Sequence, residues 1–106
     1  MSATEYRVGK NEALFREVNE RIRDVNEGLN DPSDYLCECG HAECEEHVML
    51  TPAEYEWVRS DPCRFAIVPG HEIVEVETVI ERHDRYAVVR KLGPGGAIAK
   101  ETDTRA

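Results

Sequence analysis

Three of the four cysteines of this chain lie within one short segment, CECGHAEC, which begins at Cys37. A tetrahedral zinc site needs about four thiolate or imidazole ligands, and a short loop brings several of them together at a small cost in chain entropy. Cys37, Cys39 and Cys44 supply three such ligands in the spacing C-x-C-x4-C, and Gly40 allows a tight turn between them. The spacing predicts a zinc site, with unligated thiols and redox or iron–sulfur chemistry as the alternatives.

The fourth ligand has four candidates, which are His41, His47, Cys63 and His71. His41 lies inside the loop, where its ring would have to fold back on its own neighbours, whereas His47 follows Cys44 at an easy distance. His71 lies in the segment VPGHE, where a turn after a strand could present its imidazole from a distant part of the chain. Because closing a long loop stabilises a small core most, we favour His71, and His47 and Cys63 remain open.

Chain length supports the need for such a cross-link. A chain of 106 residues has room for one domain with a modest core. It contains no apolar run near the ~18 residues of a membrane span, and its first residues do not resemble a secretion signal. We therefore expect a cytoplasmic protein without a membrane segment, in a reducing compartment where cysteines more often bind metal than form structural disulfides.

Charge is unevenly distributed along the chain. The formal net charge is -9, and ten carboxylates with no Lys or Arg lie between Asp24 and Val58. Such a field repels phosphates, so nucleic-acid binding is disfavoured. The acidic stretch is either a solvated surface or a face for a basic protein partner. The nucleic-acid alternative would need a basic patch on the C-terminal hairpin, made of Arg82, Arg85, Arg90 and Lys91.

Residues 11–27 have a helical pattern, with Asn11 as the expected N-cap and Gly28 in the left-handed position after the last turn. Its apolar residues are spaced by three and four, as in a coiled-coil seam. They are Phe15, Val18, Ile22, Val25 and Leu29. We expect this amphipathic helix to pack on the core of its own domain, with homodimerisation or partner docking through the same stripe as the alternative.

A second, short helix follows an extended segment at residues 47–50. Thr51 and Glu54 form a capping box, Pro52 takes the first helical position, and the Asp61-Pro62 pair stops the helix. Tyr55 and Val58 are expected to be buried, while Trp57 could lie exposed at a binding surface.

The C-terminal half is predicted to be β structure. Residues 64–69 read as a strand, and residues 73–92 read as two strands joined near His83 and Asp84, although residues 73–82 also fit a helix. We therefore predict a small α+β domain stabilised by zinc over residues 10–92, with two helices and an antiparallel hairpin or small sheet. Residues 1–9 and 93–106 are expected to be disordered tails.

The motif order also resembles that of a set of short bacterial proteins of unassigned function. The shared features are C-x-C-G-x3-C, the segment LTPAEYEWVR, the segment F-x-x-V-P-G-H-E and a DRYAVVRK strand, over about residues 11–91. These proteins have a presumed zinc site, and the resemblance implies that the metal ligands are Cys37, Cys39, Cys44 and His71. It implies no activity.

Three thiolates and one imidazole make a closed structural zinc site, whereas a catalytic zinc keeps a position for water. Three thiolates also weaken zinc as a Lewis acid. Glu38, Glu43 or Glu72 could act as acid/base partners only if water held one position, and no HExxH, Ser-His-Asp or phosphate-loop motif accompanies them. We expect a non-enzymatic interaction or regulatory module stabilised by zinc, with a thiol redox sensor as an alternative.

Overall fold

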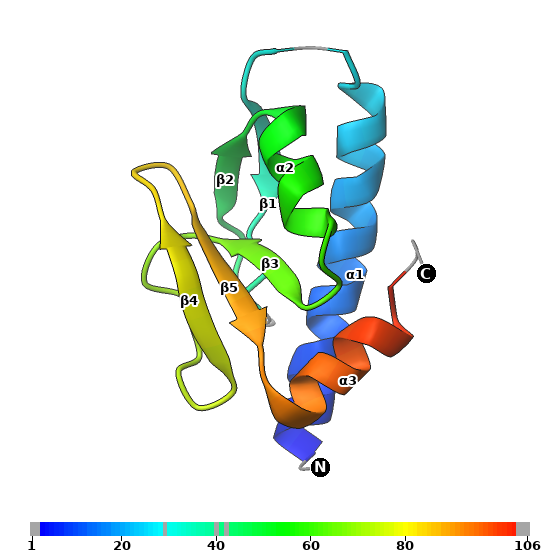
Figure 1. Ribbon diagram of the computed structural model, residues 1–106, viewed down its shortest axis with the longest axis vertical. Helices are drawn as coiled ribbons and strands as arrows, with labels where there is room; N and C mark the ends of the chain where they lie inside the picture. Colours follow the sequence, from blue (N-terminus) through cyan, green and yellow to red (C-terminus); the bar gives the residue numbers. More distant parts are fainter. Residues whose placement is uncertain (1–2, 29, 40, 42, 104–106) are drawn as a thin grey trace.

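The computed structural model describes residues 3–28, 30–39, 41 and 43–103, and over these residues the chain has an α+β fold (Figure 1). Three helices accompany two small antiparallel sheets in this part of the chain, which confirms the predicted fold class. The elements in order are α1 (Ala3–Val25), β1 (Ser33–Leu36), β2 (His47–Leu50), α2 (Pro52–Arg59), β3 (Arg64–Ile67), β4 (Glu77–Arg82), β5 (Ala87–Lys91) and α3 (Gly93–Glu101).

Helix α1 is longer than predicted at its N-terminal end. It begins at Ala3, so Asn11 lies inside the helix and is not its N-cap, and residues 3–9 are helical, not disordered. A helix that is already nucleated extends at little cost per residue, which explains why a segment without apolar periodicity can still be helical. The predicted C-terminal end is correct, because Gly28 has a φ of 88°, in the left-handed region.

The buried face of α1 is polar. Glu12, Arg16 and Asn19 are buried, whereas Val25 of the predicted apolar stripe is 84% exposed. Ile22 is half-buried and packs against the core, while Leu29 of the same stripe lies outside the described residues. The helix does pack on its own domain, but largely through polar side chains that have partners on other elements.

Strands β1 and β2 form a two-stranded antiparallel hairpin. The register pairs Ser33 with Leu50 and Leu36 with His47. The extended segment at residues 47–50 was predicted, whereas its partner β1 was not assigned from the sequence. The cysteine-rich segment connects the two strands. Pairing of Leu36 with His47 therefore holds the two ends of this segment close together.

Helix α2 is built as the sequence predicts. The side chain of Thr51 accepts a hydrogen bond from the backbone of Glu54, and the Glu54 carboxylate accepts one from the backbone of Thr51. Tyr55 and Val58 are buried, and Trp57 is 41% exposed.

The second sheet has three strands in the order β3-β5-β4, with β5 in the centre. Strands β4 and β5 form the predicted hairpin, and a register shift between Val79 and Glu81 interrupts their pairing. Residues 77–82 are therefore a strand, and the alternative of a helix over residues 73–82 is wrong, because the chain turns at residues 74–76 just before β4.

Helix α3 occupies part of a segment that was expected to be disordered. Residues 93–101 are helical, with Pro94 in the first turn and Ile98 and Ala99 buried. The segment is rich in glycine, which disfavours helix formation, but contact with α1 and β5 overrides this local preference. A Cβ atom at Gly96 would lie 3.3 Å from the carbonyl oxygen of Lys91, so the glycine allows close packing of α3 on the end of β5.

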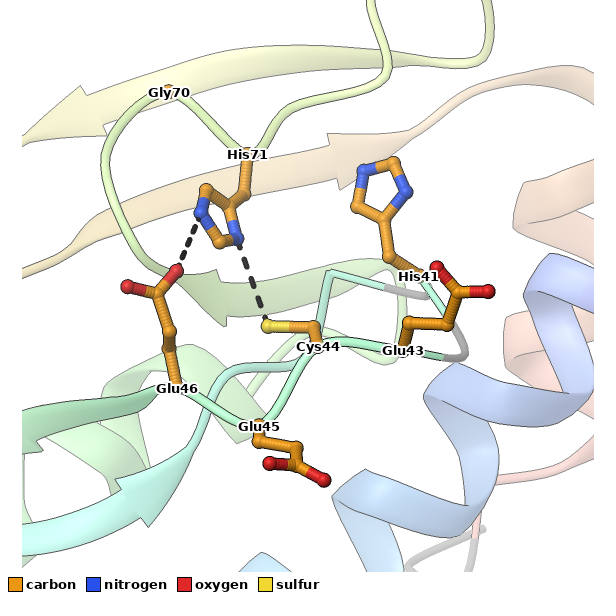
Figure 2. Close-up of a pocket in the computed structure, with 7 residues that line it drawn as sticks. All are labelled: His41, Glu43, Cys44, Glu45, Glu46, Gly70 and His71. Carbon is orange, nitrogen blue, oxygen red and sulfur yellow. Dashed lines mark hydrogen bonds and ion pairs between the residues drawn. The ribbon is translucent and has the colours of Figure 1, made fainter.

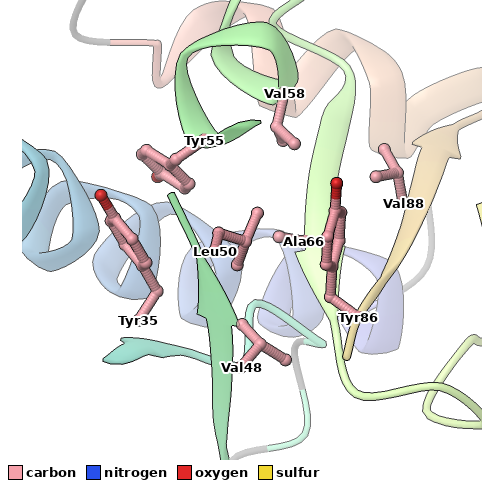
Figure 3. Close-up of a cluster of buried hydrophobic side chains, with 8 residues drawn as sticks. All are labelled: Tyr35, Val48, Leu50, Tyr55, Val58, Ala66, Tyr86 and Val88. Atoms are coloured by element: carbon pink, nitrogen blue, oxygen red, sulfur yellow. The ribbon is translucent and has the colours of Figure 1, made fainter. Parts of the chain in front are cut away.

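Both sheets and α2 contribute to one apolar cluster, in which the rings of Tyr35 and Tyr55 stack at 4.6 Å (Figure 3). Its buried members are Tyr35, Val48, Leu50, Tyr55, Val58, Ala66, Tyr86 and Val88. Among the described residues, no helix has the length and apolar character needed to cross a membrane.

Candidate metal centre

Four side chains that the sequence singles out converge in the structure. Cys37, Cys39, Cys44 and His71 each offer one ligand atom, and these atoms all lie within 4.8 Å of one another. Cys37 and Cys39 are buried, whereas Cys44 and His71 are half-buried. The three thiols come from the connection of the β1–β2 hairpin, and the imidazole comes from the segment that follows β3.

The hairpin holds the two ends of the metal loop together. The backbone N–H of Cys37 donates to the carbonyl of Glu46 at 3.0 Å, which extends the strand pairing by one step beyond Leu36. Within the loop, the backbone N–H of Cys44 donates to the carbonyl of His41 at 3.0 Å. Strand pairing and an internal turn therefore bring Cys44 back beside Cys37.

The C-x-C spacing places Cys37 and Cys39 together because side chains alternate in extended backbone. The backbone N–H of Glu38 donates to the carbonyl of Ala66 at 2.8 Å, so this short segment pairs with β3. Both cysteines join an apolar cluster with Phe65. Two thiols therefore share one side of the chain, and Glu38 points away from them.

Glu38 is fully buried, and both of its carboxylate oxygens accept hydrogen bonds. One carboxylate oxygen accepts from Tyr55 Oη at 2.7 Å and from Asn19 Nδ2 at 2.9 Å, and the other accepts from the backbone N–H of Ala66 at 2.9 Å. Burial raises the pKa of Glu38, although these hydrogen bonds oppose the shift. Glu38 therefore ties the metal loop to α1, α2 and β3 and does not face the thiols as an acid/base group.

Asn19 on α1 also holds the strand that leads into the loop. Its Nδ2 donates to the carbonyl of Leu36 at 2.9 Å, and its Oδ1 accepts from the backbone N–H of Leu36 at 2.7 Å. These two hydrogen bonds to the backbone of Leu36 resemble those that a neighbouring strand would make. A buried asparagine on the first helix thus helps to set the position of the first thiol.

His71 reaches the thiols because the chain turns sharply after β3. Gly70 has a φ of 97°, and the backbone N–H of His71 donates to the carbonyl of Val68 at 3.0 Å. Nδ1 of His71 lies 3.7 Å from Sγ of Cys37 and 3.7 Å from Sγ of Cys44. The backbone N–H of Val68 also donates to Sγ of Cys37 at 3.1 Å, so the same turn positions both His71 and the Cys37 thiol.

The other edge of the His71 ring faces Glu46. Nε2 of His71 lies 2.8 Å from Oε2 of Glu46 (Figure 2). In many metal sites the second ring nitrogen of a histidine ligand donates to a carboxylate, which orients the ring and makes the ligand more basic. The sequence does not distinguish Glu46 from its acidic neighbours, and only its position at the end of the hairpin loop could have suggested this role.

A hydrogen bond joins the thiols of Cys37 and Cys39. It lowers the pKa of Cys39 to about 4 and, together with burial, raises the pKa of Cys37. Burial also raises the pKa of Cys44. A metal binds all three as thiolates, so binding would release protons from Cys37 and Cys44.

The separations fit a tetrahedral zinc ion. Zinc bonds of about 2.3 Å to sulfur and 2.0 Å to nitrogen at a tetrahedral angle separate the two ligand atoms by about 3.5 Å. The observed distance from His71 Nδ1 to two of the sulfurs is 3.7 Å. The donor set and its spacing are therefore compatible with zinc.

The remaining ligand candidates do not belong to this group of four side chains. Cys63 is buried, and its Sγ lies 3.7 Å from the carbonyl of Gly96 on α3. His47 is an exposed residue at the start of β2. His41 is exposed, and its ring lies edge-on to that of His71 with 6.3 Å between centroids.

A pocket of about 320 Å³ opens on the half-buried side of the site (Figure 2). Cys44 and His71 line it together with three carboxylates and the His41 imidazole. Its lining residues are His41, Glu43, Cys44, Glu45, Glu46, Gly70 and His71. The buried thiols of Cys37 and Cys39 do not line this pocket.

The basic patch proposed for the nucleic-acid alternative does not form as a free cationic surface. Lys91 is only 2% exposed, and every basic side chain of the patch pairs with a carboxylate. The pairs are Arg82 with Glu72, Arg85 with Glu54, Arg90 with Asp61, and Lys91 with both Glu12 and Glu77.

Comparisons of the chain with protein-family models, with curated proteins and with solved structures found no match. The comparisons therefore do not confirm the resemblance to short bacterial proteins with a presumed zinc site. The interpretation of the site rests on the geometry of the four side chains.

Proposed function

We propose that this chain is a non-enzymatic protein-interaction or regulatory module, stabilised by zinc bound to Cys37, Cys39, Cys44 and His71. The observation that carries the proposal is the convergence of three thiols and one imidazole within 4.8 Å. Soft thiolate and borderline imidazole donors favour zinc over magnesium or calcium, which prefer oxygen ligands.

A structural role for the metal follows from the composition of the donor set. Three thiolates and one imidazole fill the four positions of a tetrahedral ion, which leaves none for a catalytic water. The ion would join the loop of the β1–β2 hairpin to the turn after β3, two segments that follow strands of different sheets. In a small domain such a cross-link contributes directly to folding.

A protein partner of basic character is the kind of ligand that the surface favours. Ten carboxylates without a Lys or Arg lie between Asp24 and Val58, and Trp57 is 41% exposed on α2 in the same segment. Exposed tryptophan is enriched at the centres of protein interfaces. Homodimerisation through α1 is the alternative, for which Leu14, 58% exposed, and Val25 are the exposed apolar residues.

A nucleic-acid-linked role loses its main support, because each basic residue of the proposed hairpin patch pairs with a carboxylate. A thiol redox sensor remains a second candidate. The half-burial of Cys44 beside two buried thiols favours it, since a peroxide could reach this sulfur first. Oxidation of two thiols would form one disulfide and reduce hydrogen peroxide to two water molecules.

Elemental analysis of protein purified without chelator tests the proposal. We expect one zinc per chain, and chelation should lower the free energy of unfolding. Protein that holds no metal and has four freely titratable thiols would overturn it. Under mild peroxide, zinc release coupled to formation of one disulfide would favour the sensor over an inert structural site.

A further inference from the structure

A second pocket, of about 350 Å³, lies between α2 and the β4–β5 hairpin, away from the metal centre. Two aromatic and two acidic side chains line it. Its lining residues are Ala53, Glu54, Trp57, Glu81 and Tyr86. Trp57 is 41% exposed, so a ligand in this pocket would have direct access to the indole.

The charges that line this pocket are negative. Glu54 is ionised, since its hydrogen bonds with Thr51 and Arg85 outweigh burial and lower its pKa. Arg85 offsets that charge by binding both Glu54 oxygens, at 3.1 and 2.9 Å. Glu81 has a different neighbour, His83, at 2.8 Å. Among the described residues, Glu81 is therefore the carboxylate of this pocket without a Lys or Arg partner, and the described lining contains no Lys or Arg.

Both rings beside the pocket already contact guanidinium groups of this chain. Cζ of Arg64 lies 4.0 Å from the centroid of the Trp57 ring, and Cζ of Arg85 lies 5.6 Å from that of Tyr86. Cations are attracted to the faces of tryptophan and tyrosine rings within about 6 Å of the centroid. Each ring thus already has one guanidinium group against it, and Glu81 provides the negative charge for a further cation.

We propose that this pocket binds a lysine or arginine side chain of a basic protein partner. The aliphatic part of that side chain would lie against Ala53 and Trp57, and its charged end would pair with Glu81. Long cationic side chains bury their aliphatic stems on apolar surface in this way. The inference rests on the proposed role as an interaction module and names the chemistry of the partner.

Trp57 is the only tryptophan of the chain, so its fluorescence reports on this pocket directly. The experiment uses the full chain as purified, with its metal content measured on the same sample. The probe is a short Gly/Ser peptide that contains four lysines, and the control peptide has four glutamines in their place. We expect a saturable change in Trp57 fluorescence with the lysine peptide only.

Two variants with the same change in charge separate the pocket from general attraction to an acidic protein. Glu81→Gln should raise the Kd of the lysine peptide about threefold to fivefold, as for a partly exposed ion pair. Glu43→Gln, in the pocket beside the metal centre, should leave the Kd unchanged. Equal weakening by both variants, or no saturable binding of the lysine peptide, would overturn the inference.

The two proposals can fail separately. Protein that holds one zinc but does not bind the lysine peptide would overturn only the inference about this pocket. Protein that binds the peptide through Glu81 but contains no zinc would support the pocket and overturn the zinc-stabilised module.

Discussion

The imidazole of His71 lies between Glu46 and the thiol cluster. Its Nε2 is 2.8 Å from Oε2 of Glu46, and its Nδ1 is 3.7 Å from Sγ of both Cys37 and Cys44. Because a neutral imidazole has one donor and one acceptor nitrogen, donation from Nε2 to Glu46 leaves Nδ1 free to bind a metal. The carboxylate thus selects the ring tautomer that the proposed zinc site needs.

Loss of a ligand should destabilise the domain severely. Cys39→Ser and His71→Ala should each remove zinc and cost several kcal/mol in the free energy of unfolding, because structural zinc contributes on the order of 10 kcal/mol. His47→Ala is the matched control and should have little effect, since His47 is exposed and outside the cluster. Denaturant unfolding with metal analysis measures this, and equal effects of the two histidine variants would contradict the choice of His71.

The contact between Glu46 and His71 should strengthen zinc binding, so its loss should lower the zinc affinity. Glu46→Gln should weaken zinc binding about 10-fold to 100-fold, as is typical when the outer partner of a histidine ligand is altered. Glu45→Gln makes the same change in charge in the same pocket. Competition with a chromophoric chelator would compare the two affinities, and a similar loss in both variants would mean that charge alone matters.

The buried carboxylate of Glu12 should make stability depend on pH. Burial raises the pKa of Glu12 from 4.5 to about 8, although Lys91 lies 2.8 Å away and opposes the shift, while Glu77 and Glu38 add to it. A carboxyl group whose pKa is higher in the folded state favours folding at low pH, and that contribution is lost between about pH 4.5 and 8. The size of this pKa shift corresponds to a loss of a few kcal/mol in the free energy of unfolding.

Glu12→Gln isolates this effect, because zinc binding and other titrating groups contribute equally to both proteins. The free energy of unfolding of the variant minus that of the parent should rise from pH 4.5 to 8 and then level off. Chemical unfolding at a series of pH values measures the difference. A difference that does not change with pH would show that Glu12 keeps an ordinary pKa.

Two adjacent glycines of α3 should respond in opposite directions to alanine. At Gly95 a Cβ would meet only Cδ of the Lys91 side chain at 3.5 Å, an ordinary van der Waals contact, so Gly95→Ala should stabilise the helix by up to about 1 kcal/mol. At Gly96 a Cβ would lie 3.3 Å from the backbone oxygen of Lys91 and 3.7 Å from Sγ of Cys63. Gly96→Ala should therefore cost about 1 kcal/mol or more. Thermal unfolding would show this contrast, and identical effects would argue against the packing of α3.

Part of this structure could be predicted from local features of the sequence. The capping box at Thr51 and Glu54 placed α2, and turn residues and β-branched residues placed β3 and the β4–β5 hairpin. The cysteine spacing and the benefit of closing a long loop selected the four side chains that the structure brings together. Each of these signals lies within a few residues of the feature that it predicts, or involves the few residue types that bind zinc.

The features that were missed depend on partners far apart in the chain. Glu12 and Asn19 look like solvent-facing helix residues until Lys91 and Glu38 are placed against them. Helix α3 looks like a glycine-rich tail until its contacts with α1 and β5 are known. Glu46 is one of several acidic residues near Cys44, and only the position of the His71 ring distinguishes it.

The β1–β2 ribbon has only two strands, and a two-stranded ribbon has little stability by itself. Its loop carries three of the four proposed ligands, whereas the β3-β5-β4 sheet contributes none from its strands. Metal loss should therefore loosen the ribbon first at its loop end, whereas Tyr35, Val48 and Leu50 keep its strands in the core. Backbone amides next to the loop would then exchange with solvent faster than those of β5, and the strand ends freed there would become the first sites at which two copies of the chain could pair.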